Sequence, residues 1–326
     1  MNIKEVFEYL SKDIKENLYS KDYQNIISKA STLNTWFLPQ FICSSFYNLT
    51  YLLDTIKDET LLTSYTYNSP KKNILIIAAG NIPMVCFHDI MCVLLTGNHA
   101  TVKLSSKDNV LIPFVFERLE KTYPEIKNYI DFLQSPTKTT IYDGVIATGS
   151  NSTRLVFEQY FSSLKHIIRG TMHSVAVIKE GDDLSGLEDD ICLYFGFGCR
   201  NVSHLFVPKG YRFDALKSKL EKYNYLLDAN KYRNNFDYQK AIMTMNNIPF
   251  SILSPILLRE NDDLYAPISV LYYSYYEDIN GLNAYLCKHK DELQIILDDS
   301  TFGTAQKPTF TSYADNLNTV SWLLDI

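Results

Sequence analysis

NILIIAAG, at residues 73–80, is the stretch of sequence that decides the fold, because it is a continuous apolar run that ends in glycine. Such a run is typical of a strand buried on both faces of a parallel sheet. A helical pattern follows in IPMVCFHDIMCVLLTG (82–97), and HATVKLS (99–105) has the pattern of a second strand. The alternation continues through a helix at 110–123, a strand at 143–149, a helix at 151–164 and a strand at 173–179. Four such alternations predict a doubly wound α/β domain.

The flanking regions have a different character. Residues 6–18 and the aromatic-rich stretch 36–56 carry apolar residues at helical spacing, which predicts amphipathic helices. After Gly181 a second α/β lobe is expected. It runs through a helix at 186–195, the FGFGCRN loop, a strand at 203–208, a helix at 213–223, a polar asparagine-rich stretch, and strands around 250–258 and 267–273.

Composition narrows the class of protein. The 326 residues are 46% hydrophobic and 21% charged, which is typical of globular proteins and excludes a disordered or fibrous chain. The net charge of −6 argues against a nucleic-acid or membrane-surface binder. No apolar run approaches the roughly 20 residues of a membrane span. The start, MNIKEVFEYL, has no signal-peptide core, so we expect a cytoplasmic protein.

Glycines surround one of the six cysteines. Cysteine is often a small buried hydrophobe, and that interpretation is open for every one of them. Cys199, however, follows GFG, and glycines beside a thiol let a substrate carbonyl and backbone N–H groups approach the sulfur. The loop therefore suits either a nucleophile or a packing cysteine beside a turn. The others stand apart from such glycines: Cys43, Cys86, Cys92, Cys192 and Cys287.

Polar residues follow three of the predicted strands. Asn81 opens the helix after the first strand, where it suits either a helix cap or an amide directed at an oxyanion. Lys103 ends the second strand, as an exposed lysine or a ribose contact. Gly149 and Ser150 end the third, where backbone N–H groups can face a phosphate.

The order of these motifs is more specific than any one of them. GNIP (80–83), VKLSS (102–106), ATGSN (147–151), the glycine-flanked Cys199 and DLYAP (263–267) together resemble the aldehyde dehydrogenase superfamily. FHDIMCVLLTGNHATVKLSSKD and YFGFGCRNVSHLFVPKGY, at 87–108 and 194–211, narrow the resemblance to its LuxC-like acyl-CoA reductase branch.

The resemblance implies an aldehyde-dehydrogenase-like α/β fold with a Rossmann-type cofactor domain and a second α/β catalytic domain. On this basis we divide the chain into four parts. They are an N-terminal helical segment packing on the cofactor domain (1–70), the cofactor-binding domain (71–179), the catalytic domain (180–295) and a C-terminal segment packing back on the body (296–326).

The resemblance also implies roles for single residues. Cys199 would be the nucleophile that forms a thioacyl enzyme, and Asn81 would donate to the oxyanion together with the Cys199 N–H. Asp263 stands where the family carries a glutamate that holds the nicotinamide ribose. The expected cofactor contacts are Lys103, Ser105, Ser106, Gly149, Ser150 and Asp263.

Two departures from the superfamily bear on function. Arg169 stands about where hydrolytic members carry the glutamate that activates water, so the acyl enzyme is expected to resist hydrolysis. Ser106 stands where NAD-specific members carry a glutamate for the 2′-hydroxyl, and Lys107 follows it. A serine beside a lysine tolerates a 2′-phosphate, which favours NADPH.

We therefore predict an NADPH-dependent reductase that converts an acyl-CoA or acyl-carrier protein thioester to an aldehyde. Two alternatives stay open: a cysteine acyltransferase or thioesterase without nicotinamide chemistry, and a non-catalytic subunit of an acyl-transfer complex. We also expect that the protein has an acyltransferase or acyl-protein synthetase as a partner and that it forms a homo-oligomer. No metal is expected, because the six histidines lack the spacing of metal ligands. Among them only His204, the nearest to Cys199 in the sequence, is a candidate for a catalytic role.

Overall fold

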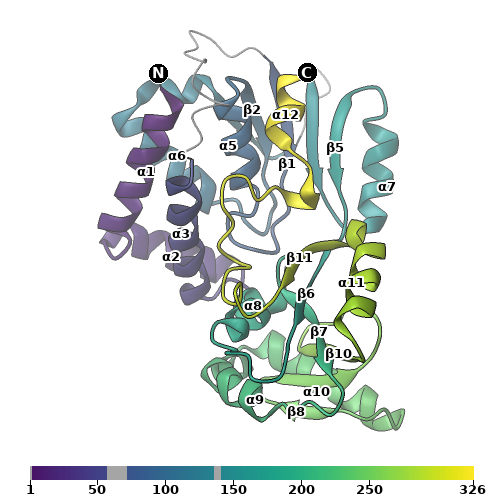
Figure 1. The fold of residues 1–326 in the computed structure, drawn as a ribbon. Helices are drawn as coiled ribbons and strands as arrows, with labels where there is room; N and C mark the ends of the chain where they lie inside the picture. Colours follow the sequence, from purple (N-terminus) through teal and green to yellow (C-terminus); the bar gives the residue numbers. More distant parts are fainter. Residues whose placement is uncertain (1, 57–71, 136–140) are drawn as a thin grey trace. The chain divides into compact units, whose positions relative to one another are not determined.

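The computed structural model describes residues 2–56, 72–135 and 141–326 (Figure 1). The chain forms two compact units. Unit 1 comprises residues 1–171 and 308–326, and unit 2 comprises residues 172–307. Every helix in the described ranges is too short or too polar to cross a lipid bilayer.

A five-stranded parallel sheet, in the order β3-β2-β1-β4-β5, is the centre of unit 1. At its carboxyl edge Ile77 pairs with Lys103 on one side and with Ala147 on the other. The predicted strands at 73, 99 and 143 are therefore adjacent. The strand bounds are β1 Asn73–Ile77, β2 His99–Lys103, β3 Ile130–Leu133, β4 Gly144–Thr148 and β5 Lys165–Arg169.

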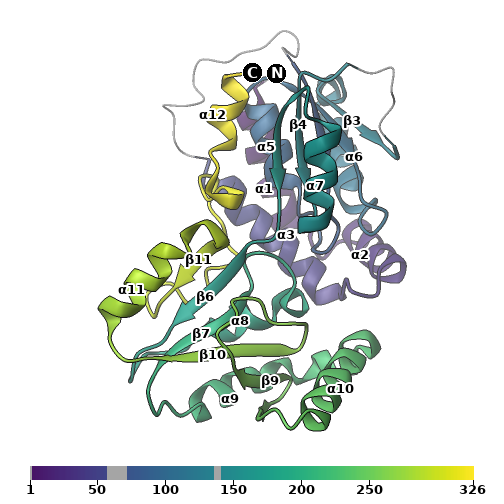
Figure 2. The same cartoon turned by 90° about the vertical axis from the view of Figure 1, so that its right-hand side faces the viewer.

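Helices cover both faces of this sheet (Figure 2). On one face α5 (Phe87–Leu95) is almost wholly buried, as its predominantly apolar sequence requires. On the other lies α7 (Asn151–Tyr160), in which no residue is fully buried. The side chains on the two faces of β1 pack into different hydrophobic clusters, because successive side chains of a strand point to opposite faces. Ile74 and Ile76 join the cluster of α5, whereas Leu75 packs with Phe161 after α7.

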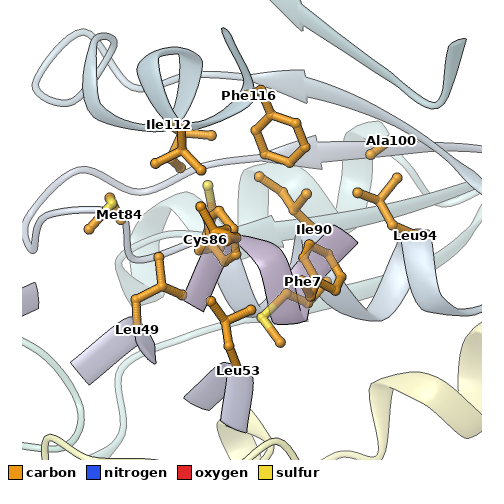
Figure 3. Packing of buried hydrophobic residues seen from close by; sticks show 14 of the residues in the cluster. Phe7, Leu49, Leu53, Met84, Cys86, Ile90, Leu94, Ala100, Ile112 and Phe116 are labelled. Atoms are coloured by element: carbon orange, nitrogen blue, oxygen red, sulfur yellow. The ribbon is translucent and has the colours of Figure 1, made fainter. Parts of the chain in front are cut away.

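The N-terminal helices and the end of the chain complete unit 1. Phe7 of α1 contacts Phe87 of α5 edge to face, and Arg118 of α6 forms an ion pair with Asp13 of α1. Figure 3 shows how α1, α3 and α6 bring Phe7, Leu49 and Phe116 around α5. The bounds are α1 Ile3–Asn17, α2 Lys21–Leu33, α3 Pro39–Asp54, α6 Leu111–Thr122 and α12 Thr319–Leu324, with 3-10 turns at Pro124–Asn128 and Ala314–Asn316.

Unit 2 has its own sheet, in the order β11-β6-β7-β10-β9-β8. All neighbours are parallel except the β8–β9 hairpin. The bounds are β6 His173–Val177, β7 Val202–Pro208, β8 Ser251–Leu253, β9 Ile256–Glu260, β10 Val270–Tyr276 and β11 Leu293–Leu297.

Helices of unit 2 pack on that sheet in two clusters. One cluster joins α11 to β6 and β7, and the other joins α10 to β9 and β10. The polar asparagine-rich stretch is the 16-residue helix α10, because Tyr232, Phe236 and Met243 give it a buried side. The bounds are α8 Leu187–Cys192, α9 Asp214–Leu220, α10 Asn230–Met245 and α11 Ile279–Lys288, with 3-10 turns at Leu193–Gly196, Glu221–Asp228 and Lys290–Glu292.

One strand lies in a different sheet from the one expected. The predicted strand at 173–179 is β6, which pairs with β7 and β11 in unit 2 instead of extending the first sheet. Its place at the edge of the first sheet is taken by β5, a strand absent from the prediction, and residues 170–172 separate β5 from β6. The predicted α/β fold with two α/β domains is confirmed by this architecture.

Candidate active site

Six of the predicted site residues share one edge of the unit 1 sheet. Asn81 follows β1, Lys103 ends β2 with Ser105 and Ser106 after it, and Gly149 and Ser150 follow β4. Because β2, β1 and β4 are adjacent and parallel, their carboxyl ends meet at the same edge. In doubly wound sheets that edge is where ligands bind.

Close packing determines the loop that carries Asn81. The Asn81 side chain is exposed, but Gly80 before it is buried against the loop after β2. A Cβ on Gly80 would lie only 2.3 Å from Ser105 Oγ, so a larger residue does not fit. Farther along, Met84 has a positive φ of 57°, and its N–H donates to Asp108 Oδ2 at 2.6 Å. Burial raises the pKa of Asp108 to about 6.

One hydrogen bond to the end of β1 and one within the loop hold the end of β2 and the loop after it. The carbonyl of half-buried Lys103 accepts from the Ala78 N–H at 3.0 Å, and Ser105 Oγ accepts from the Lys107 N–H at 3.3 Å. Ser106 is exposed beside Lys107. Two hydroxyls and two amines are therefore grouped at the end of β2.

Ser150 has a structural task at the start of α7. Its Oγ accepts from the Thr153 N–H at 3.3 Å and caps the helix. The N–H of Gly149, one of the groups expected to face a phosphate, donates instead to the carbonyl of Arg169 at 3.2 Å. A Cβ on Gly149 would lie 2.8 Å from Thr153 Cγ2, so this glycine lets the helix approach the strand closely.

Arg169 is a buried structural cation. Its Nη1 lies 2.5 Å from Asp89 Oδ2, and its Nη2 donates to Thr319 Oγ1 at 3.0 Å. The two charged side chains are 4% and 7% exposed. The side chain therefore joins β5 to α5 and α12.

In unit 2, Cys199 ends a loop with an unusual backbone. Tyr194, Phe195, Gly196 and Gly198 all have positive φ, at 55°, 60°, 76° and 98°. Tyr194 and Phe195 are buried, and Phe195 stacks on Tyr232 with ring centroids 5.2 Å apart. Left-handed backbone at residues with a Cβ costs energy and persists where the surrounding packing enforces it, often at functional sites.

Neutral side chains hold this loop in place. Ser174 Oγ of β6 donates to the carbonyl of Cys199 at 2.6 Å. Asn201 Nδ2 donates to the carbonyl of Leu193 at 2.8 Å, and Asn201 Oδ1 accepts from Gln306 Nε2 at 3.0 Å. The segment that carries Gln306 is held in turn by Asp190, which accepts from the Gly303 and Ala305 N–H groups. The nucleophile candidate is thus anchored on both sides.

Cysteine environments differ sharply. Burial raises the pKa of the Cys43 thiol and raises those of Cys86, Cys92 and Cys192 much further. Such thiols are poor nucleophiles at neutral pH. Cys199 is half-buried in its loop, and Cys287 is exposed on α11.

Arg200 lies within electrostatic range of Cys199. Burial lowers the pKa of the Arg200 guanidinium, and the Cys199 sulfur acts in the opposite direction when it is charged. A nearby cation favours a thiolate over a thiol. Arg200, next to Cys199 in the sequence, is thus a cation suited to assist the nucleophile.

His204 positions the segment that contains Asp263. Both ring nitrogens are engaged, Nδ1 with the carbonyl of Asp263 and Nε2 with Ser274 Oγ, each at 2.9 Å. Ser203 Oγ donates to the next carbonyl, that of Leu264, at 2.6 Å. The Asp263 carboxylate itself is exposed. A fully buried histidine with both nitrogens bonded is unsuited to acid–base catalysis.

Sequence reasoning missed the residues that hold the site residues in place. Asp108 and Asn201 lie within the two quoted motifs but were assigned no role, and Ser174 and Gln306 lie outside them. Asp108 precedes a predicted helix and has the pattern of an ordinary cap, and Asn201 follows the cysteine motif at only two residues' distance. Their partners are specified by the fold.

The sequence matches the family described as acyl-CoA reductase (LuxC) over residues 10–242, well over half of the chain. A search of curated proteins found no match.

Solved structures with a similar fold are aldehyde dehydrogenases. Aldehyde dehydrogenase 21 from Physcomitrella patens matches with a TM-score of 0.63 at 12% identity, over 99% of this chain and 83% of its own. The Bacillus cereus enzyme matches at 0.62 and 14% identity, over 91% and 75%. The indole-3-acetaldehyde dehydrogenase of P. syringae matches at 0.61 and 12% identity, over 91% and 75%.

The match spans both loops described above, the one with Asn81 and the one with Cys199, and the fold is that of the aldehyde dehydrogenases. The chain belongs to the acyl-CoA reductase (LuxC) family.

Proposed function

We propose that this protein reduces an acyl-CoA or acyl-carrier protein thioester to an aldehyde with NADPH through a thioacyl enzyme on Cys199. Family membership supports an oxidoreductase that converts an acyl substrate to an aldehyde. The Cys199 thiolate attacks the thioester carbonyl, the new carbon–sulfur bond forms, and the CoA thiolate leaves. Hydride then adds to the carbonyl carbon, and the aldehyde departs as the Cys199 thiolate is regenerated.

The observation that carries this proposal is the Cys199 loop. Four of the five residues before Cys199 have a left-handed backbone, and Ser174 of β6 holds the Cys199 carbonyl. The thiol is therefore presented by a backbone that is held in place. Arg200 supplies a cation within electrostatic range of the sulfur. The deeply buried Cys86, Cys92 and Cys192 are distinguished from it by burial, which raises their pKa values far above the ordinary range.

Asn81 is the proposed donor to the developing oxyanion. Its side chain is exposed at the carboxyl edge of the unit 1 sheet, and the packing of Gly80 on Ser105 holds the loop from which it projects. An amide held in place before the reaction stabilises the tetrahedral intermediate without reorganisation. We assign this role from the family resemblance and expect Asn81→Ala to lower kcat more than it raises KM.

A nicotinamide cofactor fits the edge formed by β2, β1 and β4. When bound, NADPH supplies the hydride. Lys103 and Ser105 would hold the adenosine ribose, Ser106 and Lys107 would accept a 2′-phosphate, and the start of α7 after Gly149 and Ser150 would face the pyrophosphate. One structural neighbour, the P. syringae enzyme, is described in complex with NAD⁺. The choice of NADPH rests on the absence of a carboxylate at position 106.

Two observations favour reduction over hydrolysis. The residue at position 169 is an arginine, whose guanidinium stays protonated and is paired with Asp89, so it cannot act as a base. Both nitrogens of His204 are bonded. General-base assistance to water contributes typically about 10²- to 10⁴-fold. The thioacyl enzyme is therefore proposed to last long enough for reduction.

The test is a mass measurement combined with two assays. The protein is mixed with a long-chain acyl-CoA or the corresponding acyl-carrier protein, and the adduct is mapped by mass spectrometry. NADPH absorbance and free thiol are followed in parallel. We expect an adduct on Cys199 and NADPH consumption matched to thiol release, both lost in Cys199→Ala and both kept in the matched control Cys287→Ala.

Other outcomes distinguish the alternatives. Thiol release without NADPH consumption would indicate an acyltransferase or thioesterase. A lack of both, in folded protein, would indicate a non-catalytic subunit. An adduct that persists in Cys199→Ala would overturn the assignment of the nucleophile.

A further inference from the structure

Two loops at the edge of the unit 1 sheet are joined by a single carboxylate. The Asn81 loop, residues 78–86, leads from β1 to α5, and the cofactor loop, residues 104–110, leads from β2 to α6. Asp108 belongs to the cofactor loop, yet its Oδ2 accepts the Met84 N–H of the Asn81 loop at 2.6 Å. This hydrogen bond lies three residues beyond Asn81.

The Asn81 loop needs such a support. Met84 has a left-handed backbone with φ of 57°, which for a residue with a Cβ costs roughly 1–2 kcal/mol. Met84 is 5% exposed and belongs to the same core cluster as Leu49 and Ile112, which are labelled with it in Figure 3. The apolar side chain and the N–H therefore anchor the same residue, one in the core and the other on Asp108.

Asp108 is itself held on the cofactor loop. It is 6% exposed, and its N–H donates to the Ser105 carbonyl at 3.1 Å. Ser105 is the residue against which Gly80 packs. The chain from Gly80 through Ser105 and Asp108 to Met84 is thus a closed set of contacts, with Asn81 inside it.

We propose that Asp108 is a positioning residue that locks the Asn81 loop onto the cofactor loop, so that the amide of Asn81 is held for the reaction by the same segment that carries Ser105 and Ser106. The inference rests on the proposed role of Asn81. It concerns how that amide is held, which nothing in the motif pattern indicates.

A double-mutant cycle tests it. The four proteins are wild type, Asn81→Ala, Asp108→Ala and the double variant, each assayed for the rate of acylation by acyl-CoA in a single turnover. Displacing a catalytic group by about 1 Å costs up to about 100-fold. We expect Asp108→Ala to slow acylation by about 10- to 100-fold in the wild-type background and by less than about twofold when Asn81 is already alanine.

Two further variants separate positioning from stability. Asp108→Asn keeps an acceptor for the Met84 N–H and should restore most of the acylation rate. Asp13→Asn removes a similarly buried carboxylate of unit 1, one that binds Arg118 and Tyr23 and contacts neither loop. It should lower the melting temperature and leave the acylation rate unchanged.

The outcomes separate the inference from its premise. If Asn81→Ala acylates at the wild-type rate, the proposed role of Asn81 is wrong. If Asn81→Ala is slow while Asp108→Ala is either harmless or fully additive with it, Asn81 keeps its role and Asp108 does not position it.

Discussion

The Asn81 loop of unit 1 and the Cys199 loop of unit 2 both have a strained backbone, but different side-chain groups hold it in place. Both contain left-handed residues other than glycine, Met84 in one and Tyr194 with Phe195 in the other. The Asn81 loop is held directly by the Asp108 carboxylate and by the Ser45 hydroxyl, which donates to the Pro83 carbonyl. The helix into which it runs is tied by the Asp89–Arg169 ion pair. The Cys199 loop is held directly by a hydroxyl and by carboxamides.

This difference has a functional logic. A carboxylate next to a nucleophilic sulfur would repel the thiolate and favour the unreactive thiol. Neutral donors and acceptors give the Cys199 loop its rigidity without that penalty. In unit 2 the Asp190 carboxylate accepts from the N–H groups of Gly303 and Ala305, and Asn201 is bonded by the Asp190 main-chain carbonyl and by Gln306.

The largest expected effect concerns the ion pair behind the Asn81 loop. Arg169→Glu would place a second buried carboxylate beside Asp89, and breaking a buried pair costs about 3–5 kcal/mol. We expect the free energy of unfolding of unit 1 to fall by that amount in urea titrations. Arg154→Glu is the matched control, because the Arg154–Glu158 pair is solvent-exposed and contributes about 1 kcal/mol or less. Equal losses would show that the charge at 169 is not the support we describe.

A second prediction compares two buried carboxyl groups by their pH dependence. Burial raises the pKa of Asp108 and that of Asp190 to about 6 each, from the ordinary 3.8. The native state therefore holds these protons more tightly than the unfolded chain does. The contribution to stability is present below about pH 4 and is lost as the pH rises through about 6.

Asp108→Asn and Asp190→Asn remove one of these titrations each. The stability of the wild type relative to either variant should fall by about 3 kcal/mol between pH 4 and pH 7. Chemical unfolding at four pH values measures it, and the untouched carboxyl cancels in each comparison. Parallel pH curves for wild type and variant would mean that the group titrates normally in the folded protein.

The smallest effect on stability separates backbone strain from catalysis. Gly198 and Gly210 have φ of 98° and 82°, and a Cβ on Gly210 would meet nothing within 4 Å. Alanine at either position should cost about 1–2 kcal/mol of strain. Only Gly198→Ala, beside Cys199, should also slow acylation, by about tenfold or more.

The two glycine variants also allow a result that would contradict this prediction. If Gly198→Ala acylates as fast as Gly210→Ala at matched stability, the left-handed turn before Cys199 shapes the fold and not the chemistry.

The helices and strands with a clear apolar pattern were predicted correctly from the sequence. The runs that became β1, β2 and β4 are buried on both faces, and α5 is the apolar helix between them. The strand β5, KHIIR, was missed because only two apolar residues mark it between charged ends. In α10 three buried side chains are spread over 16 mainly polar residues, so its helical period is weak.

Only the site residues that belong to recognisable motifs were predicted from the sequence. Asn81, Lys103, Gly149 and Ser150 lie at the edge where strand order requires them. Their supports depend on contacts that no local pattern encodes. Gln306 reaches Asn201 across 105 positions in the sequence, and Asp108 reaches Met84 across 24.

Unit 1 is built from two segments of the chain that are separated by unit 2, so the ribosome completes unit 2 before unit 1. Trp322 and Ile326 cover Gly144 of β4, and Thr319 Oγ1 accepts from the Arg169 guanidinium, so residues 308–326 are part of unit 1. These residues are translated after the whole of unit 2. Chains emerge at about 5–20 residues per second, so unit 2 has a continuous sequence to fold from while unit 1 waits several seconds for its last side chains. During that interval Gly144 of β4 lacks the Trp322 and Ile326 side chains that cover it in the folded protein.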